Sequence, residues 1–284
     1  AGGTGGHIFP GLAIAEAFQH RGYRVSWLGA HGLEQELVPK ANIPLYALPI
    51  RGLRGKGVLG WITLPFRLFK AVAYAYRYLR QSKPEVVIGF GGFASAPGGI
   101  AAALLRIPLV IHEQNAVAGL SNRLLAKVSC LQFSAFPETL PNAEVVGNPV
   151  RDKFFHFPSS RERYAARRDE PLRILVVGGS QGARRLNQLI VEAAMQLQRP
   201  IHLWHQTGGA LYRESEQLWR EVGLMPYRLT PFIDEMAEAY AWADLVICRA
   251  GALTVSELMA VGVASLLIPF PYAVDDHQTA NAAG

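Results

Sequence analysis

The feature that most constrains the fold is a glycine-rich turn that occurs twice. Residues 2–6 and 178–182 both have the pattern Gly-Gly-hydroxyl-X-Gly, and an apolar, helix-forming stretch follows each of them. A turn of this kind between a strand and a helix presents free backbone N–H groups and a helix N-terminus to an anion. Glycine pairs also make ordinary tight turns, but two turns in register favour two related halves that bind phosphate groups.

Short β-branched or apolar runs alternate with helix-length stretches along the whole chain. This alternation predicts an α/β fold with parallel sheets, rather than a sandwich or a helix bundle. The expected strands are residues 24–28, 45–48, 86–90, 109–112, 130–133, 144–146, 173–177, 202–205, 228–229, 245–248 and 265–268.

The turn Gly147-Asn148-Pro149 predicts a boundary between two domains, residues 1–148 and 149–284. A length of 284 residues suits two domains. The chain opens at its first glycine-rich turn with no strand before it, and residues 278–284 have the pattern of a helix that has only begun. We therefore expect a sequence truncated at both ends, with a central sheet position of the first domain left empty.

Composition excludes several classes of protein. Half of the residues are hydrophobic and 18% are charged, which excludes intrinsic disorder. Arg106 interrupts the longest apolar run, residues 98–111, so no segment has the length of a spanning helix. Cys130 and Cys248 lie far apart in apolar runs, a pattern more typical of buried thiols in a reducing compartment such as the cytoplasm than of a disulfide framework.

The net charge of +6 is unevenly distributed. Residues 1–150 carry 14 Lys or Arg against 7 Asp or Glu, whereas the remainder carries 14 against 15. Residues 51–84 hold eight basic side chains and no acidic one, which predicts an anionic partner. In the helix expected here, an apolar face with cations beside it has two interpretations: docking on an anionic membrane leaflet, or packing on the sheet with the cations solvated. That apolar face consists of Leu68, Val72, Ala75 and Leu79, and the cations are Arg67, Lys70, Arg77 and Arg80.

The known sequence motifs for phosphate binding are missing, which excludes several types of ligand site. The dinucleotide pattern G-x-G-x-x-G fails because Ile8 stands where its last glycine belongs. In addition, the strand at 24–28 ends in Leu28-Gly29-Ala30, without the acidic residue that would hold a ribose. No Walker motif occurs, and no D-x-D pair is present to hold a divalent cation. We therefore expect a phosphate site without a metal, and no cofactor.

A second group of signals lies near the end of the chain. Residues 249–258 form a small-residue turn that opens a helix with hydroxyl groups in its first turn, and Glu257 follows about one turn in. A diphosphate at this helix start would receive N–H groups, and Glu257 is suited to hold both hydroxyls of a ribose. A glutamate near a helix start is also an ordinary stabilising feature.

Several motifs taken together resemble the MurG family, the bacterial N-acetylglucosaminyltransferases that make lipid II. They span the whole chain in the family's order: residues 1–10, 89–99 (GFGGFASAPGG), 112–115 (HEQN), 147–151, 178–183, 249–258 and 275–281. The resemblance implies the GT-B fold, two Rossmann-like doubly wound domains facing a cleft. It also implies metal-free, inverting transfer of GlcNAc from UDP-GlcNAc to lipid I, at the cytoplasmic face of the inner membrane, by a peripheral protein.

The resemblance also implies site residues. His7 is the expected catalytic base, although a helix-capping or ligand-orienting role is the alternative. The acceptor diphosphate would meet Gly91, Gly92 and Ser95. The family's UDP-GlcNAc site falls on Thr4, Gly5, Gly6, Asn115, Arg151, Ser180, Ile233, Ala252, Leu253, Thr254, Val255, Ser256, Glu257 and Gln278.

Three alternatives remain open at this stage. A sugar-nucleotide epimerase of the same architecture would bind UDP-GlcNAc without needing a lipid-facing surface. A non-catalytic sugar-nucleotide sensor or membrane-docking module would bind without turnover. Nucleic-acid binding by the basic segment ranks last, because no recognised motif accompanies the charge.

Overall fold

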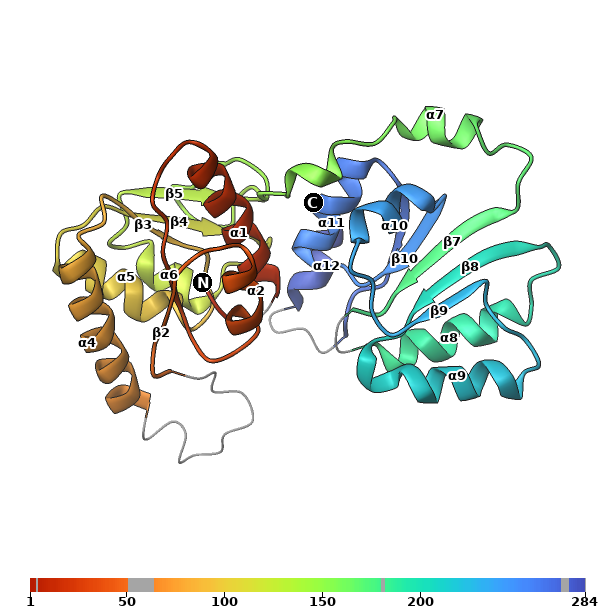
Figure 1. The fold of residues 1–284 in the computed structure, drawn as a ribbon, viewed down its shortest axis with the longest axis horizontal. Helices are drawn as coiled ribbons and strands as arrows, with labels where there is room; N and C mark the ends of the chain where they lie inside the picture. Colours follow the sequence, from red (N-terminus) through yellow and green to blue (C-terminus); the bar gives the residue numbers. More distant parts are fainter. Residues whose placement is uncertain (4, 51–63, 180–181, 272–275, 284) are drawn as a thin grey trace. The chain divides into compact units, whose positions relative to one another are not determined.

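The computed structural model describes residues 1–3, 5–50, 64–179, 182–271 and 276–283. The chain forms two compact units, Ala1–Arg151 and Asp152–Ala283. Each unit is built from helices and parallel β-strands (Figure 1), so the predicted α/β class is confirmed.

The first unit contains two parallel sheets. β1 pairs with β2, and β3, β4, β5 and β6 form a second sheet in that order. The described strands are β1 (Trp27–Gly29), β2 (Leu45–Ala47), β3 (Val87–Gly89), β4 (Leu109–Glu113), β5 (Leu131–Ser134) and β6 (Glu144–Val145). The described helices are α1 (Gly5–His20), α2 (Glu34–Lys40), α4 (Leu64–Ser82), α5 (Ser95–Leu104) and α6 (Leu120–Leu125).

A cavity of about 780 Å³ lies between β1 and β3 and is lined by both strands. None of the described strands occupies this central position, so β1 pairs on one side only, with β2. Because β2 begins at Leu45, opposite Trp27, the first strand is shorter than the predicted residues 24–28, and Arg24 and Ser26 are exposed.

The helix α4 packs its apolar face inside the first unit. Ala75 and Leu79 are buried, and Leu68 and Val72 pack against the same core cluster. The apolar face of α4 is therefore packed inside the first unit and is not free to dock on a membrane. No helix among the described residues is long and apolar enough to span a bilayer.

The second unit has one parallel sheet, in the order β11-β10-β7-β8-β9. Its strands are β7 (Leu172–Val177), β8 (Ile201–Gln206), β9 (Arg228–Thr230), β10 (Leu245–Cys248) and β11 (Ala264–Leu267). Its helices are α7 (Ser160–Ala165), α8 (Arg184–Ala194), α9 (Tyr212–Glu221), α10 (Met236–Trp242), α11 (Ala252–Val261) and α12 (His277–Ala283), with 3-10 turns η1 (Asp152–Phe154) and η2 (Gly209–Leu211).

Two helix layers enclose this second sheet. α8 and α9 lie together on one face, where Leu186 and Trp219 pack against Val176 and Leu203 of the sheet, and α10 and α11 lie on the other face (Figure 1). Because the strands of this sheet are parallel, their carboxyl ends and the loops that follow them lie at one edge of the sheet. Ligands bind at this edge in folds of this type.

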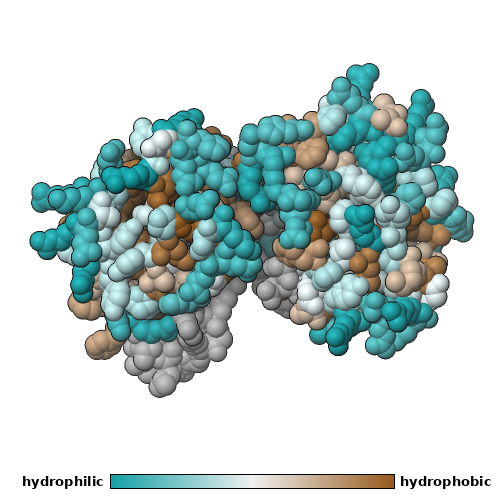
Figure 2. All heavy atoms as spheres, in the orientation of Figure 1, coloured by the Kyte–Doolittle hydropathy of each residue, from teal (hydrophilic) through white to brown (hydrophobic). Residues whose placement is uncertain are grey.

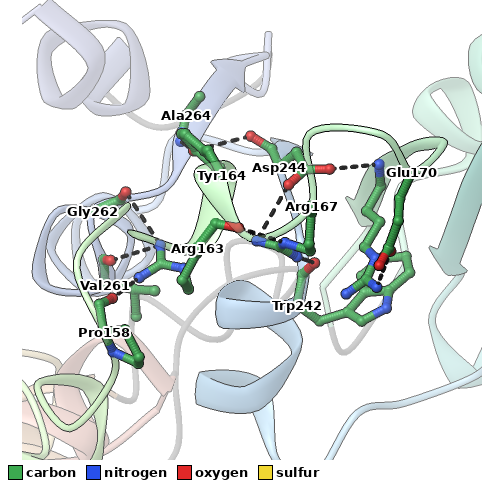
Figure 3. A network of polar contacts seen from close by, with 11 residues as sticks. Pro158, Arg163, Tyr164, Arg167, Glu170, Trp242, Asp244, Val261, Gly262 and Ala264 are labelled. Carbon is green, nitrogen blue, oxygen red and sulfur yellow. Dashed lines mark hydrogen bonds and ion pairs between the residues drawn. The ribbon is translucent and has the colours of Figure 1, made fainter. Parts of the chain in front are cut away.

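Side chains of the helix α7 bind the C-terminal end of α11 (Figure 3). Arg163 is buried and donates hydrogen bonds to the carbonyl oxygens of Val261 at 3.0 Å and Gly262 at 3.3 Å. A cation at a helix C-terminus stabilises the helix dipole. Tyr164 links the same helix to the sheet through a 3.2 Å hydrogen bond from its hydroxyl to the carbonyl of Asp244, directly before β10. These contacts hold in place the helix that begins with the predicted donor-binding residues.

Candidate functional site

Two glycine turns of the first unit pack against each other beside His7. His7 lies in the first turn of α1 and is half-buried. Gly91 and Gly92 both have positive φ, 75° and 73°. A Cβ atom at Gly92 would lie 2.3 Å from the carbonyl oxygen of Gly2, and one at Gly91 would lie 3.3 Å from the His7 ring. Only glycine allows both this backbone conformation and this close approach.

The histidine ring is held by the segment that ends β4. Nδ1 of His7 lies 3.0 Å from Oε1 of Gln114, which is buried. Nε2 of Gln114 lies 2.9 Å from the main-chain oxygen and 3.0 Å from Nδ1 of His112. Nε2 of His112 in turn lies 2.9 Å from the carbonyl oxygen of Gly147. Burial lowers the pKa of His112, despite opposing effects of the Gly147 carbonyl and the Glu113 carboxylate, so its ring is neutral at pH 7.

Glu113 organises the loop that carries Asn115. Its carboxylate is buried and accepts hydrogen bonds from the main-chain N–H groups of Asn115 and Gly119, both at 3.1 Å, and from the side chain of Asn122 at 2.9 Å. Such multiple donors compensate the cost of burying a carboxylate. Asn115 itself is half-buried, with its conformation set by Glu113.

In the second unit, Gln206 connects two loops at the carboxyl edge of the sheet. Its buried side chain bonds both main-chain groups of Gly179, at 3.0 Å and 3.1 Å, and donates to the carbonyl of Pro231 at 2.9 Å. Gly179 belongs to the second glycine-rich turn, and Pro231 lies two residues before Ile233, which is buried. One side chain therefore joins two parts of the predicted donor site.

The helix α11 begins after Gly251 with the predicted donor segment. Gly251 has an extended backbone and acts as the N-cap residue, so the first N–H groups of the helix follow it. Glu257 lies further along this helix and is 7% exposed. The hydroxyl of Ser256 donates to the carbonyl of Ala252 at 3.0 Å.

Two side chains hold residues 268–270, which follow β11. Arg249 donates to the carbonyl oxygens of Ile268 at 3.1 Å and Pro269 at 3.0 Å. The side-chain oxygen of Gln278, in α12, accepts from the N–H of Phe270 at 2.8 Å. Gln278 therefore lies beside Phe270, in the segment that follows β11.

The described residues bring together part of the predicted site. Gly5, Gly6 and His7 share one helical turn, next to the glycine pair at 91 and 92. Ser95 is buried at the start of α5 and donates its hydroxyl to the Gly91 carbonyl, which closes that turn. Arg151, the last residue of the first unit, lies with its guanidinium 4.8 Å from the ring centroid of Phe9. Asn115 also belongs to the first unit. The remaining described donor residues, Ile233, 252–257 and Gln278, belong to the second unit, whereas Thr4 and Ser180 lie outside the described residues.

Sequence reasoning assigned no role to Gln114, His112, Glu113 or Gln206. In the structure, Gln114 contacts His7 and Glu113 contacts Asn115, both predicted site residues, whereas His112 contacts Gln114 and Gln206 contacts Gly179 of the second glycine-rich turn. A signal was available for each of them. All follow or end a buried parallel strand, and polar residues at strand carboxyl ends are typical of functional loops in this fold class.

Comparison with known proteins agrees with this arrangement. A model of the glycosyltransferase family 28 N-terminal domain matches residues 1–129, and one of the family's C-terminal domain matches residues 173–284. A protein of Cellvibrio japonicus (strain Ueda107), named UDP-N-acetylglucosamine--N-acetylmuramyl-(pentapeptide) pyrophosphoryl-undecaprenol N-acetylglucosamine transferase, is 54% identical, and the match covers 99% of this chain and 80% of that protein.

Solved structures show the same relationship. The crystal structure of MurG from Acinetobacter baumannii has a TM-score of 0.81 and 45% identity, and the match covers 99% of this chain and 80% of that one. A UDP-GlcNAc 2-epimerase from Neisseria meningitidis has a TM-score of 0.63 at 14% identity, over 94% of this chain and 80% of that one, a likeness of fold alone. The fold and these matches define a glycosyltransferase of the GT-B type. The chain belongs to glycosyltransferase family 28, and within it to the MurG family.

Proposed function

We propose that this protein transfers GlcNAc from UDP-GlcNAc to the 4-hydroxyl of MurNAc in undecaprenyl-diphospho-MurNAc-pentapeptide, giving lipid II for peptidoglycan synthesis. The observation that carries this function is the 54% identity, over 99% of the chain, to a transferase named for this donor and acceptor. The epimerase alternative is not favoured, because the likeness to an epimerase is limited to the fold.

The proposed reaction is a direct displacement at the anomeric carbon. His7 accepts the proton of the acceptor hydroxyl while that oxygen forms the new bond to carbon 1 of GlcNAc, and the bond from carbon 1 to the diphosphate oxygen of UDP breaks. The configuration at carbon 1 is inverted. A base is required because an alcohol is a poor nucleophile at neutral pH. The place of His7 in an N-terminal turn, between two glycine turns, supports this role.

The proposed donor site uses helix starts in the second unit. The N-terminal turns of α8 and α11 present N–H groups and a favourable dipole to the UDP diphosphate, with Ser180 as a further donor. Ile233 contacts uracil, and Glu257 accepts hydrogen bonds from the ribose hydroxyls. In this proposal the other donor contacts come from Thr4, Gly5, Gly6, Asn115, Arg151, residues 252–256 and Gln278, and no metal takes part.

The acceptor is proposed to bind the first unit. Its diphosphate meets Gly91, Gly92 and the start of α5 at Ser95. Phe66 and Phe69, which are 82% and 76% exposed near the start of α4, are proposed to enter an anionic membrane leaflet while the neighbouring cations bind lipid headgroups. Figure 2 shows hydrophobic side chains at this end of α4 and hydrophilic ones further along it. The protein would thus be peripheral, at the cytoplasmic face of the inner membrane.

Transfer of labelled GlcNAc to a lipid-diphosphoryl-MurNAc acceptor, with the full-length gene product and a chelator present, tests this function. We expect the product to form at the same rate with and without chelator. A folded protein that binds UDP-GlcNAc but forms no product would contradict the proposal, and conversion of UDP-GlcNAc without acceptor would identify an epimerase instead.

A further inference from the structure

A chain of hydrogen-bonded polar groups runs from the main chain of Gly147 to the His7 ring. The groups are the carbonyl of Gly147, the imidazole of His112, the amide of Gln114 and the imidazole of His7, joined by contacts of 2.9–3.0 Å. All lie in the first unit, and His112 and Gln114 are 3% and 1% exposed. Of these four groups, only His7 has a role in the proposed transfer reaction.

The orientation of the Gln114 amide follows from its neighbours. One end of the amide lies 2.9 Å from the main-chain oxygen of His112, which can only accept a hydrogen bond. That end must therefore be the NH₂ group. The same NH₂ group lies 3.0 Å from Nδ1 of His112. The carbonyl end, Oε1, is thereby directed at His7.

The protonation of His112 agrees with this orientation. Its Nε2 lies 2.9 Å from the Gly147 oxygen, also an acceptor, so Nε2 carries the proton. Because the ring is neutral, Nδ1 has a free lone pair, which accepts from the Gln114 NH₂ group. Two independent main-chain acceptors thus give the same direction of hydrogen bonding along the whole chain of groups.

We propose that Gln114 and His112 are positioning residues that hold His7 in the tautomer protonated at Nδ1, so that the lone pair of Nε2 is free to take the acceptor proton. Oε1 of Gln114 has no proton to give, so Nδ1 of His7 must donate to it. The catalytic part of this inference rests on the proposed function, whereas the tautomer itself follows from the hydrogen bonds alone.

An amide has a specific advantage over a carboxylate in this position. In a Ser-His-Asp triad, an ionised carboxylate both orients the histidine and stabilises the imidazolium. A neutral amide orients the ring through the same Nδ1–H contact but does not favour the charged form before the acceptor binds.

The first test is the tautomer of His7 in the full-length protein with ¹⁵N-labelled histidine. Two-bond ¹H–¹⁵N correlation spectra distinguish a protonated from an unprotonated ring nitrogen. We expect Nδ1 protonated and Nε2 unprotonated for His7, and the reverse for His112. This measurement on the unmodified protein needs no variant to fold. A His7 ring protonated at Nε2 alone overturns the proposal.

Two substitutions test the catalytic consequence. Gln114→Leu removes the acceptor for Nδ1, and we expect a mixture of tautomers and a loss in kcat of at least about tenfold, below the roughly 100- to 10,000-fold loss from removing a base. Gln114→Glu keeps an acceptor but adds charge, so we expect the Nδ1–H tautomer to persist and the acid limb of the pH–rate profile to move to higher pH.

A matched control exists in the same unit. Gln35 pairs with His31 at 2.9 Å on the exposed surface, and Gln35→Leu should change neither the His7 spectrum nor the rate. A folded Gln114→Leu protein with unchanged tautomer and kcat overturns the proposal. An unmodified protein with the expected tautomer but no transfer activity supports the hydrogen-bond assignment and overturns the proposed function instead.

Discussion

Gln206 holds Gly179 by both of its main-chain groups: Oε1 accepts from the N–H at 3.0 Å, and Nε2 donates to the carbonyl at 3.1 Å. The same Nε2 donates to Pro231 at 2.9 Å. The backbone of Gly179 is thus coupled to the segment that leads to Ile233. In the proposed donor site, these two loops contact different parts of UDP-GlcNAc.

Gln206→Leu should therefore weaken donor binding more than it slows the chemical step. Loss of hydrogen bonds to buried main-chain groups costs about 1–3 kcal/mol. We expect the KM for UDP-GlcNAc to rise roughly tenfold to a hundredfold, with a smaller change in kcat. Steady-state kinetics at saturating acceptor measure this. Gln217→Leu is the control, because Gln217 is exposed on α9 and hydrogen-bonds to the exposed Glu221. An unchanged KM in folded Gln206→Leu protein would contradict the proposed donor site.

His7→Ala should have the opposite kinetic signature. Removal of the base is expected to lower kcat by about 100- to 10,000-fold. The affinity for UDP-GlcNAc, measured by calorimetry, should change little. His20→Ala is a control in the same helix, because His20 is exposed at the C-terminal end of α1. Equal losses in turnover and donor affinity would instead favour a ligand-orienting role for His7.

The strand pattern was predictable because its cause is local. Parallel strands covered on both faces need continuous apolar runs, and each predicted run has a counterpart among β1 to β11. The residues at which a strand begins and ends depend instead on the neighbouring strand with which it pairs. The strand predicted at 24–28 begins at Trp27, because its partner β2 begins at Leu45. Periodicity likewise identified the apolar face of α4, but only the structure shows that α4 packs this face against the core of the first unit.

The candidate site was only partly predictable for a similar reason. Glycine turns and a histidine directly after one of them are visible in sequence. The roles of Gln114 and Gln206 arise from contacts between residues 107 and 27 positions apart, which no local pattern contains. Glutamine is common on protein surfaces, so its burial against a glycine turn or a histidine becomes visible only in three dimensions.

Phe66 and Phe69 should control binding to membranes. Phe66→Ser with Phe69→Ser is expected to reduce sedimentation with vesicles that contain anionic phospholipid, because exposed aromatic side chains no longer enter the interface. Neutralising the cations should weaken binding further, by about 1 kcal/mol for each well-placed charge. Phe155→Ser is the control, because Phe155 is 57% exposed in the second unit. Unchanged vesicle binding after both sets of substitutions would exclude this docking surface. The cations to neutralise are Arg67, Lys70, Arg77 and Arg80.

Gly92→Ala should disturb the catalytic turn, whereas Gly22→Ala should not. Both glycines have positive φ, 73° and 83°, so both substitutions carry backbone strain. A Cβ atom at Gly92 would also lie 2.3 Å from the Gly2 oxygen, but nothing lies within 4 Å of one at Gly22. We expect a larger loss of unfolding free energy and of kcat for Gly92→Ala. Denaturant unfolding and kinetics of the two variants would contradict this if the losses were equal.

His205 should make the second unit less stable in mild acid. Burial lowers the pKa of His205 to about 4, from an ordinary value of 6.5, and the ring is fully buried between Asn187 and Trp219. The unfolded chain therefore binds a proton at a higher pH than the folded chain does, so this contribution is complete above pH 6.5 and is lost as the pH falls towards 4. A difference of this size corresponds to about 3 kcal/mol.

Chemical unfolding of the full-length protein from pH 7 to pH 4 measures this contribution. We expect the unfolding free energy to fall across this range, and His205→Gln to reduce the slope because glutamine does not titrate. His202→Gln is the control, because His202 occupies the same strand but stacks on the exposed Tyr227 instead of packing in the core. If His205→Gln and the unmodified protein lose stability with the same slope, the neutral buried form of His205 is wrong.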